Sequence, residues 1–372
     1  MDGLLTEEQQ LLLETASTYV RRHLPRDRVR SLIGTSPGHP ARYLEDTARL
    51  GWYAALVAEE YGGGSVSGQP VRELGVLAEA RGRNLQPGPF LDMNVAAFAL
   101  GRAGSAAQKS ALLPGIAAGE VAMAWVVDVD QRSPSGASPR VHRDGTGYVI
   151  DGRWPAVGDV ATADWILVTA VDEHHHPCQF LVEASAPGLA VEPLESLDLT
   201  RRFGSLVLDA VRVDHDARLE GDAAVELERQ LDLASALLAA DTVGAMRELF
   251  ESTRQYALDR IAFGRPIGSF QAVKHQLADL SLRVEASAAV VTAAAASLDD
   301  GWPEAAEVAS IAKAWVSDAG VEVAQGCMQI FGGIGFTWEH DCHLFLRRIA
   351  MNALLFGDAA WHRERVCRLH GI

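Results

Sequence analysis

Apolar positions at helical spacing dominate the first third of the chain. The pattern predicts helices over residues 4–24, 42–58, 71–81 and 91–103, followed by a short helix and a loop over 104–120. Thr6, with two glutamates directly behind it, is typical of a helix start. A glycine-rich break over 59–70 divides these helices into two groups.

The pattern of apolar residues changes near residue 121, where short apolar runs begin to alternate with turn-forming residues. The expected strands cover 121–129, 148–150, 165–171, 179–182 and 206–213. A turn over 143–147 precedes the second strand, which then meets Asp151 and Gly152. Asp-Gly pairs between alternating runs indicate antiparallel pairing, so this region is predicted to be an antiparallel β domain.

Long segments rich in Ala and Leu fill the rest of the chain. They cover 227–258, 273–298 and 303–331, and their order predicts an antiparallel helical bundle. The expected fold class is α+β and multidomain. Its parts are an N-terminal helical domain over 1–120, a central antiparallel β domain over 121–215 and a C-terminal four-helix bundle over 216–372.

Composition narrows the class of function. The 372 residues are 48% hydrophobic with a formal net charge of −16, which suits two or three domains and disfavours a nucleic-acid partner. A local basic pocket remains compatible with a phosphorylated small ligand. The four cysteines are widely spaced without a CxxC pair, which is typical of reduced thiols in a cytoplasmic protein. The polar N-terminus and the charge-interrupted apolar stretches predict neither a secretory signal nor a membrane span.

Three stretches carry a resemblance to a known family. They are LGWYAALVAEEYGGG at 50–64, YALDRIAFGRPIGSFQAVKHQLADL at 256–280 and QIFGGIGFTWEHDCHLFLRR at 329–348. The tracts DGTGYVIDGRW at 144–154 and LESLDLTRRFGSLVLDAVRV at 194–213 extend the match. Together, and in this order, they resemble the flavin-dependent acyl-CoA dehydrogenase family over essentially the whole chain, which implies that family's fold.

The resemblance also implies a reaction and a cofactor. The family removes a proton next to a thioester carbonyl while a hydride passes from the neighbouring carbon to FAD, which requires a carboxylate base. The arginine at the position of Arg260 reaches the pyrophosphate of a flavin held mainly by the adjacent subunit. The positions implied to contact the adenosine diphosphate half are Arg260, Phe263, Phe270, Gln271, Gln329, Gly332 and Gly333. The alternative interpretations are a surface arginine, core aromatics and a glycine helix cap.

The sequence departs from the family where the flavin ring and the base belong. The usual glutamate position holds Phe356, and the alternative base position holds Ala234. The positions of a stacking tryptophan and a hydroxyl donor fall in the segment 156–158, Ala-Val-Gly, although Trp154 lies close by. The half of the flavin site built within one subunit is therefore degraded, whereas the half given to a neighbouring subunit is retained.

Asp241 is the candidate replacement base, because it lies in an otherwise apolar helix where a carboxyl pKa should rise. The alternative is a buried aspartate paired with an arginine. Asp232, and Asp358 at a position where the family has a hydroxyl residue, are weaker candidates. The run 174–176 of three histidines is interpreted as a solvated loop rather than a metal site.

Four functions remain open from the sequence. The chain could desaturate an acyl thioester with FAD, could be a non-catalytic partner subunit that gives adenosine diphosphate contacts in trans, or could bind acyl thioesters without redox chemistry. A flavin monooxygenase built on the same fold is the fourth. The expected ligand is an acyl-CoA or acyl-carrier-protein thioester. The expected assembly is a homo-oligomer, dimer or tetramer, or a heteromer with a related subunit, and no membrane partner is expected.

Overall fold

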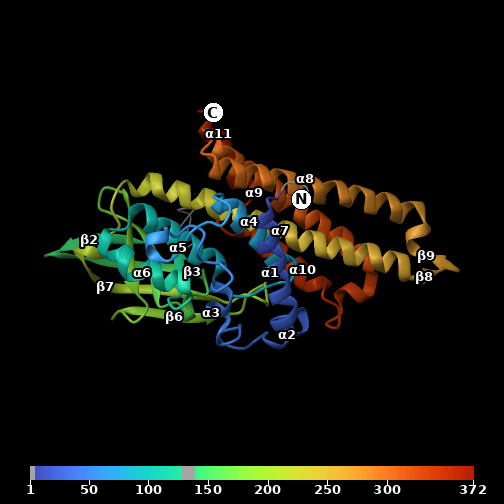
Figure 1. Cartoon of the computed structure of the whole chain (residues 1–372), viewed down its shortest axis with the longest axis horizontal. Coiled ribbons are helices and arrows are strands. Elements are labelled where there is room, and N and C mark those ends of the chain that lie inside the picture. Colours follow the sequence, from blue (N-terminus) through green and yellow to red (C-terminus); the bar gives the residue numbers. More distant parts are fainter. Residues whose placement is uncertain (1–4, 128–138) are drawn as a thin grey trace.

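The computed structural model describes residues 5–127 and 139–372. Helices occupy both ends of the chain and a twisted sheet lies between them in sequence (Figure 1). The N-terminal helices are α1 (Glu7–His23), α2 (Arg26–Ser31), α3 (Tyr43–Ala48), α4 (Pro70–Arg83), α5 (Phe90–Ala103) and α6 (Ala106–Ala118). This arrangement of helical N-terminal part, central sheet and C-terminal helices confirms the predicted fold class.

The start of α1 follows from its sequence. Thr6 accepts a hydrogen bond from the backbone N–H of Gln9, and the Gln9 side chain accepts one from the backbone N–H of Thr6. This reciprocal capping box satisfies donors that a helix start leaves unpaired. The helix expected over 42–58 is much shorter, because Gly51 adopts a left-handed φ of 80° soon after α3 and the chain continues as turns.

The central sheet is mixed rather than purely antiparallel. Its strands are β1 (Met123–Val126), β2 (Arg140–Asp144), β3 (Gly147–Gly158), β4 (Trp165–Val171), β5 (Pro177–Glu183), β6 (Leu189–Leu194) and β7 (Phe203–Asp214). Their order is β1-β4-β2-β3-β7-β6, with β5 beside β4. The pairs β1–β4 and β2–β4 are parallel, so the antiparallel prediction is wrong for them.

The Asp151–Gly152 pair lies within β3 instead of forming a turn. The register of β3 against β7 shifts between Ile150 and Gly152, which is typical of a bulge. The hairpin turn lies at the predicted place, between Asp144 and Gly147. The sequence did not predict β6, whose side chains are mostly exposed and in which only Leu189 and Val191 pack against the core of the sheet.

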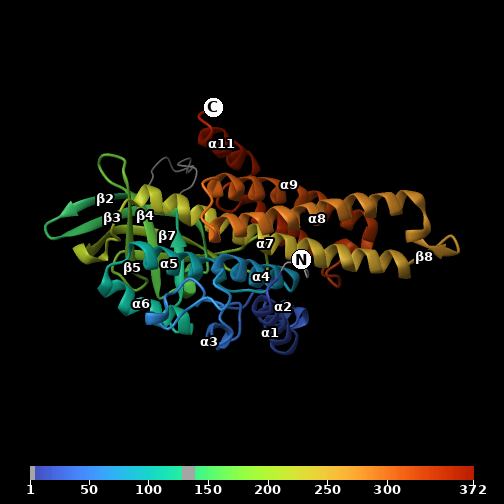
Figure 2. The ribbon, with the colours of Figure 1, turned by 45° about the horizontal axis from the view of Figure 1, so that its top comes forward.

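Five helices form the C-terminal part. They are α7 (Ala223–Asp259), α8 (Gln271–Asp299), α9 (Ala305–Phe331), α10 (Cys342–Leu354) and α11 (Ala359–Leu369). The long helices run side by side, and the small hairpin of β8 (Ile261–Ala262) and β9 (Arg265–Pro266) joins α7 to α8 at their far end (Figures 1 and 2). The predicted bundle is therefore present, with α11 added against α9.

Glycines permit a close crossing of α4 and α7. A Cβ at Gly82 would lie 1.8 Å from the backbone oxygen of Asp241, and a Cβ at Gly244 would lie 2.0 Å from that of Glu79. A side chain cannot occupy either place without moving a helix. The crossing brings the middle of α7 against the N-terminal helices, where it forms one wall of the site described below.

By length and composition alone α8 could cross a membrane, contrary to the expectation from sequence. In its most apolar window 44% of the residues are buried inside the bundle. The helix packs against α7 and α9 in the bundle.

Candidate functional site

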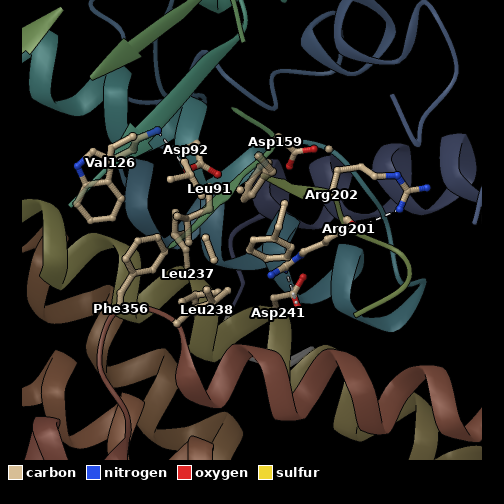
Figure 3. A pocket seen from close by; sticks show the side chains of 18 of the residues that line it. Leu91, Asp92, Val126, Asp159, Arg201, Arg202, Leu237, Leu238, Asp241 and Phe356 are labelled. Carbon is tan, nitrogen blue, oxygen red and sulfur yellow. Dashed lines mark hydrogen bonds and ion pairs between the residues drawn. The ribbon is translucent and has the colours of Figure 1, made fainter. Parts of the chain in front are cut away.

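A cavity of about 70 Å³ lies where the N-terminal helices, the sheet and the middle of α7 meet. The turn after α10 closes one side, and the start of α5 and the end of β3 face it across the cavity (Figure 3). Its lining residues include Asp92, Trp125, Ala156, Val157, Gly158, Asp159, Arg201, Leu237, Leu238, Asp241 and Phe356.

Two aromatic side chains fill the side of the cavity where the resemblance places the catalytic glutamate. The ring of Phe356 lies 4.7 Å from that of Trp125, centroid to centroid, at an angle of 31°. Trp125 is buried, and its Nε1 donates to Oε1 of Gln230 at 3.1 Å. Lys313 holds the turn behind Phe356, because its Nζ donates to the backbone oxygen of Gly357 at 3.0 Å. A phenyl ring therefore lies where the resemblance implies a proton acceptor in other members.

Asp241 is paired with basic side chains. Its carboxylate lies 3.2 Å from Nη2 of Arg201 and 3.3 Å from Nη1 of Arg348, and it accepts a hydrogen bond from Nδ2 of Asn352 at 2.7 Å. Burial opposes ionisation of Asp241, but the two guanidinium groups outweigh it and lower the pKa below its ordinary value. The rise in pKa expected for an unpaired carboxyl does not occur. Asp241 is the buried aspartate paired with arginine, which was the alternative, and this pairing removes the physical reason for choosing it as a base.

The same basic groups serve a second buried carboxylate. Nε of Arg348 donates to Asp198, and Arg348 also donates to the hydroxyl of Thr200. Arg348 is fully buried, as is Asp198. The network joins α7, α10 and the segment before β7, so it holds three parts of the chain together.

A pair of carboxyl groups that the sequence did not reveal faces the cavity. Asp92 projects from the first turn of α5, and Asp159 follows β3 (Figure 3). Burial, helped by the nearby Asp159, raises the pKa of Asp92 to about 8. Burial also raises the pKa of Asp159 to about 6, although Arg201 opposes the shift. Asp92 therefore keeps its proton at neutral pH and accepts a hydrogen bond from the backbone N–H of Trp125 at 3.3 Å.

The residues expected at the adenosine diphosphate half lie far from this cavity, around the β8–β9 hairpin. Arg260 ends α7 and is exposed, and Phe263 is 95% exposed with a left-handed φ of 52°. The ring of Phe263 meets that of Phe270 edge to face at 6.2 Å. Gln271 begins α8 and is also exposed. The hairpin thus presents a cation, an aromatic face and an amide to the outside.

The glycine turn after α9 lies near the same end of α7. Tyr256, one turn before Arg260, packs against Phe331 with ring centroids 4.8 Å apart. Gln329 is exposed, and a Cβ added at Gly332 or at Gly333 would meet no atom within 4 Å. The backbone of this turn is therefore open to close approach by a ligand or another molecule.

The weaker sequence candidates have structural roles. Asp232 pairs with Arg365 at 2.6 Å. Asp358 accepts a hydrogen bond from the backbone N–H of Trp361 and caps the start of α11. The histidines at 174–176 are exposed in the turn between β4 and β5. Within 5–127 and 139–372 no group of three or more His, Cys, Asp or Glu side chains is arranged to hold a metal ion.

Comparison with known proteins identifies the family. The acyl-CoA dehydrogenase N-terminal domain matches residues 6–120, and the acyl-CoA dehydrogenase C-terminal domain matches residues 225–369. The acyl-CoA dehydrogenase IpdE2 of Mycobacterium tuberculosis is 30% identical over 354 residues, covering 94% of this chain and 93% of IpdE2. The chain belongs to the acyl-CoA dehydrogenase family.

Two further relatives show how far the family likeness extends. The acyl-CoA dehydrogenase FadE34 of Mycobacterium tuberculosis is 35% identical over 322 residues, which is 85% of this chain but 40% of FadE34. The chain thus spans less than half the length of that relative. In the crystal structure of the ChsE4-ChsE5 complex from Mycobacterium tuberculosis, one chain is 27% identical with a TM-score of 0.90, covering 100% of this chain and 99% of that chain.

Acyl-CoA dehydrogenases use FAD, but the cavity of this family member does not fit the flavin ring. Ligand sites have volumes of roughly 300–1,000 Å³. This cavity has about 70 Å³, and a groove of about 700 Å³ adjoins it at Asp159, Arg201, Arg202 and Phe203. Ala156, Val157 and Gly158 line the cavity without a stacking ring or a hydroxyl group. Trp154 does not replace the missing tryptophan, because it is buried in the core of the sheet.

The residues around the β8–β9 hairpin and the glycine turn after α9, which we call the outer segment, fit the adenosine diphosphate half of FAD. A pyrophosphate is matched by a guanidinium group and an adenine ring by an aromatic face. Arg260 and Phe263 offer these two features on one exposed hairpin, and the open backbone at Gly332 and Gly333 admits close approach. In this acyl-CoA dehydrogenase chain the cavity thus lacks the contacts for the flavin ring, whereas the contacts for the adenosine diphosphate half are present.

Proposed function

We propose that this chain is the partner subunit of a heteromeric acyl-CoA dehydrogenase. In this assembly it donates contacts to the adenosine diphosphate half of an FAD whose ring is held by a related subunit. One observation carries the proposal: the rings of Phe356 and Trp125 fill the place where the resemblance puts the base, while the hairpin at Arg260 stays exposed. The reaction of the whole assembly is the α,β-desaturation of an acyl thioester, with FAD as the hydride acceptor.

Each residue of the outer segment has a role in the proposal. Arg260 would hold the pyrophosphate as a cation, and Phe263 and Phe270 would cover the adenosine. Gln271 and Gln329 would donate or accept hydrogen bonds at its edge, and Gly332 and Gly333 would let the backbone approach. The bound flavin would supply the hydride acceptor, and the related subunit would supply the base.

The alternatives have less support. A chain that works alone would need a proton acceptor. Asp241 is held ionised between two arginines and Asp92 holds its proton at neutral pH, which leaves Asp159, with a pKa raised to about 6, as the candidate base beside the cavity. A redox-inactive thioester-binding protein would need room for an acyl chain beside α7, and Leu237, Leu238 and Phe356 enclose a cavity of about 70 Å³. The complex named ChsE4-ChsE5, to which this chain is similar, gives the two-component arrangement independent support.

The experiment is purification with and without a related subunit that carries the glutamate base, such as the product of a neighbouring gene. Absorbance should show no flavin on the chain alone and bound flavin on the mixture, and an acyl-CoA should bleach only the mixture. A yellow protein obtained from this chain alone, bleached by acyl-CoA, would falsify the proposal.

Arg260→Ala provides the site-specific test. Because a hydrogen bond to a charged group contributes about 1.5–3 kcal/mol, the mixture should retain FAD about ten- to a hundredfold more weakly. Arg254→Ala is the matched control, since Arg254 is an exposed arginine on the same helix. Equal loss of flavin in both variants would mean that general charge, rather than a specific contact, retains the cofactor.

A further inference from the structure

The groove beside the cavity is lined by residues to which the proposed function gives no role. Its volume of about 700 Å³ lies within the range typical of small-molecule sites. The loop between α2 and α3, the turn after β3 and the segment from the end of β6 to the start of β7 form its walls, and Arg347 of α10 also lines it. Asp159 and Arg202, which line both the groove and the cavity, lie on the side of the cavity away from Phe356 (Figure 3).

Asp159 brings a buried carboxylate to the groove without a hydrogen-bond partner. The residue is 6% exposed, and in the part of the chain that the structure describes its carboxylate accepts no hydrogen bond. Burial raises the pKa of Asp159 to about 6, so the group is mostly ionised at neutral pH. A buried charge without a hydrogen bond lowers the stability of the fold. A donor on a ligand in the groove would remove that penalty.

The backbone holds Asp159 in place. Its N–H donates to the backbone oxygen of Arg202 at 2.9 Å, and its own backbone oxygen accepts from the N–H of Thr162 at 3.0 Å. The φ of Asp159 is 47°, a left-handed value that aspartate adopts more readily than most residues. The position of the carboxylate is therefore set before any ligand binds.

Arg202 offers one remaining donor beside this carboxylate. Each of the two charges shifts the pKa of the other group, so the two side chains are close. A guanidinium group has five N–H donors, and four of those of Arg202 already bond to the backbone oxygens of Leu32, Thr35, Leu199 and Arg201. One N–H group is left, next to an acceptor that has no donor.

Arg347 brings a cation to the groove without a counterion. Its Nη1 lies 3.4 Å from the backbone oxygen of Leu197, and among residues 5–127 and 139–372 it forms no ion pair. Arg201, in contrast, is paired with Asp241. Glu195 also lines the groove, but it is exposed to water, where an unpaired charge costs little. The groove thus has an unused cation in addition to the Asp159–Arg202 pair.

We propose that the groove binds a small organic acid that carries a hydroxyl group, with the carboxylate at Arg347 and the hydroxyl between Asp159 and Arg202. A hydroxyl group both donates and accepts, so it can give its hydrogen to Asp159 and accept the remaining N–H of Arg202. An ammonium group could not accept, and a second carboxylate could not donate. A guanidinium group binds a carboxylate through charge-assisted hydrogen bonds.

The rest of the groove suits an apolar body between these two groups. Apolar side chains on its walls are Ile33, Val160, Leu199 and Phe203. The inference does not depend on the proposed function, because it uses no residue of the outer segment and no flavin.

Calorimetric titration of the purified full chain tests the proposal. The probes are ω-hydroxy acids from hexanoate to hexadecanoate, each matched with the fatty acid and the diol of the same length. At the length that spans the groove, the hydroxy acid should bind at a single site and about tenfold or more tightly than either matched compound. If no length gives this difference, the proposal is overturned.

Two variants assign the ends of the ligand. Asp159→Gly, which the left-handed φ tolerates, should weaken the hydroxy acid about ten- to a hundredfold and leave the matched fatty acid unchanged. Arg347→Gln should weaken both acids by a similar factor and leave the diol unchanged. Arg254→Gln is the control, because Arg254 is exposed on α7 away from the groove. Equal losses for the hydroxy acid and the fatty acid in a folded Asp159→Gly chain would refute the hydroxyl contact.

Discussion

The behaviour of Asp241 depends on neighbours that are distant in sequence. A carboxylate in an apolar helix would hold a proton, but Arg201 and Arg348 lie within 3.3 Å of it and keep it ionised. Buried ion pairs of this kind are costly to break, because removal of one partner leaves an uncompensated charge. Asp241 therefore mainly stabilises the folded state.

Asp241→Ala should lower the free energy of unfolding by about 3–5 kcal/mol, the range typical of a broken buried ion pair. Urea unfolding of the purified chain measures this. Asp259→Ala on the same helix is the control and should stay within about 0.5 kcal/mol of wild type, because Asp259 is exposed. Unchanged unfolding of the Asp241 variant would show that the arginines tolerate its loss.

Asp92 gives the cavity a pH dependence with a definite sign. Its pKa is raised from the ordinary 3.8 to about 8, so the folded state binds more protons than the unfolded state between these values. Stability should therefore fall as the pH rises toward about 8. Asp92→Asn removes the titrating group and should be more stable than wild type above pH 8 by a few kcal/mol, at about 1.4 kcal/mol per unit of pKa difference.

Melting temperatures of wild type and Asp92→Asn between pH 5 and pH 9 would test this. The two curves should diverge toward high pH. Asp209→Asn is the control, because Asp209 is exposed on β7 and its curve should run parallel to wild type. Parallel curves for all three proteins would mean that Asp92 does not carry the linkage.

The residue scale also shows what a sequence can reveal about this site. The loss of the glutamate at Phe356 was readable, because a single motif fixes that position. The closeness of Asp92 and Asp159 could not be predicted, since Asp92 lies on α5 and Asp159 follows β3. The partners of Asp241 were hidden for the same reason: Arg201 and Arg348 come from other elements.

At the scale of elements, the crossing of α4 and α7 is the tightest contact that bounds the site. Gly82 and Gly244 leave no room for a Cβ, so the two backbones touch. Gly75 lies on the same helix α4, but a Cβ there would be 3.9 Å from Ala295, an ordinary contact. The two kinds of glycine should respond to the same substitution in opposite ways.

Gly244→Ala should destabilise the chain by about 1–3 kcal/mol, because it forces the helices apart. Gly75→Ala should be neutral or stabilise by up to about 1 kcal/mol, because alanine is the better helix former and meets no obstacle. Denaturant midpoints of both variants measure the difference. Equal midpoints would indicate that the crossing can relax without cost.

Elements were predictable where packing repeats along the chain. The long helices α7, α8 and α9 each present apolar positions for many turns, so their existence followed from spacing. The parallel pairing of β1 with β4 did not, because it depends on the path of the chain between strands rather than on either strand. The mostly exposed strand β6 has only two side chains, Leu189 and Val191, against the core, too few for a period to be detected.

In the whole molecule, the residues proposed to contact the cofactor are different from those that stabilise the fold. Phe263 is 95% exposed, so Phe263→Ala should leave unfolding of the isolated chain within about 0.5 kcal/mol of wild type. In the proposed heteromer the same change should weaken FAD retention about five- to a hundredfold, since stacking of a base on an aromatic ring contributes about 1–3 kcal/mol. Flavin absorbance after gel filtration measures it, with Val66→Ala as an exposed control. Retained flavin would remove Phe263 from the cofactor contacts.

Both kinds of residue lie on α7: Asp241, which stabilises the fold, is at the middle of the helix, and Arg260, proposed to contact the cofactor, is at its end. Nineteen residues at 1.5 Å each place them about 28 Å apart on a rigid rod. A molecule can therefore lose the chemistry at one end while the other end remains useful to a neighbour. Substitutions that fill the cavity at the middle of α7 therefore leave the geometry of the exposed tip at Arg260 unchanged.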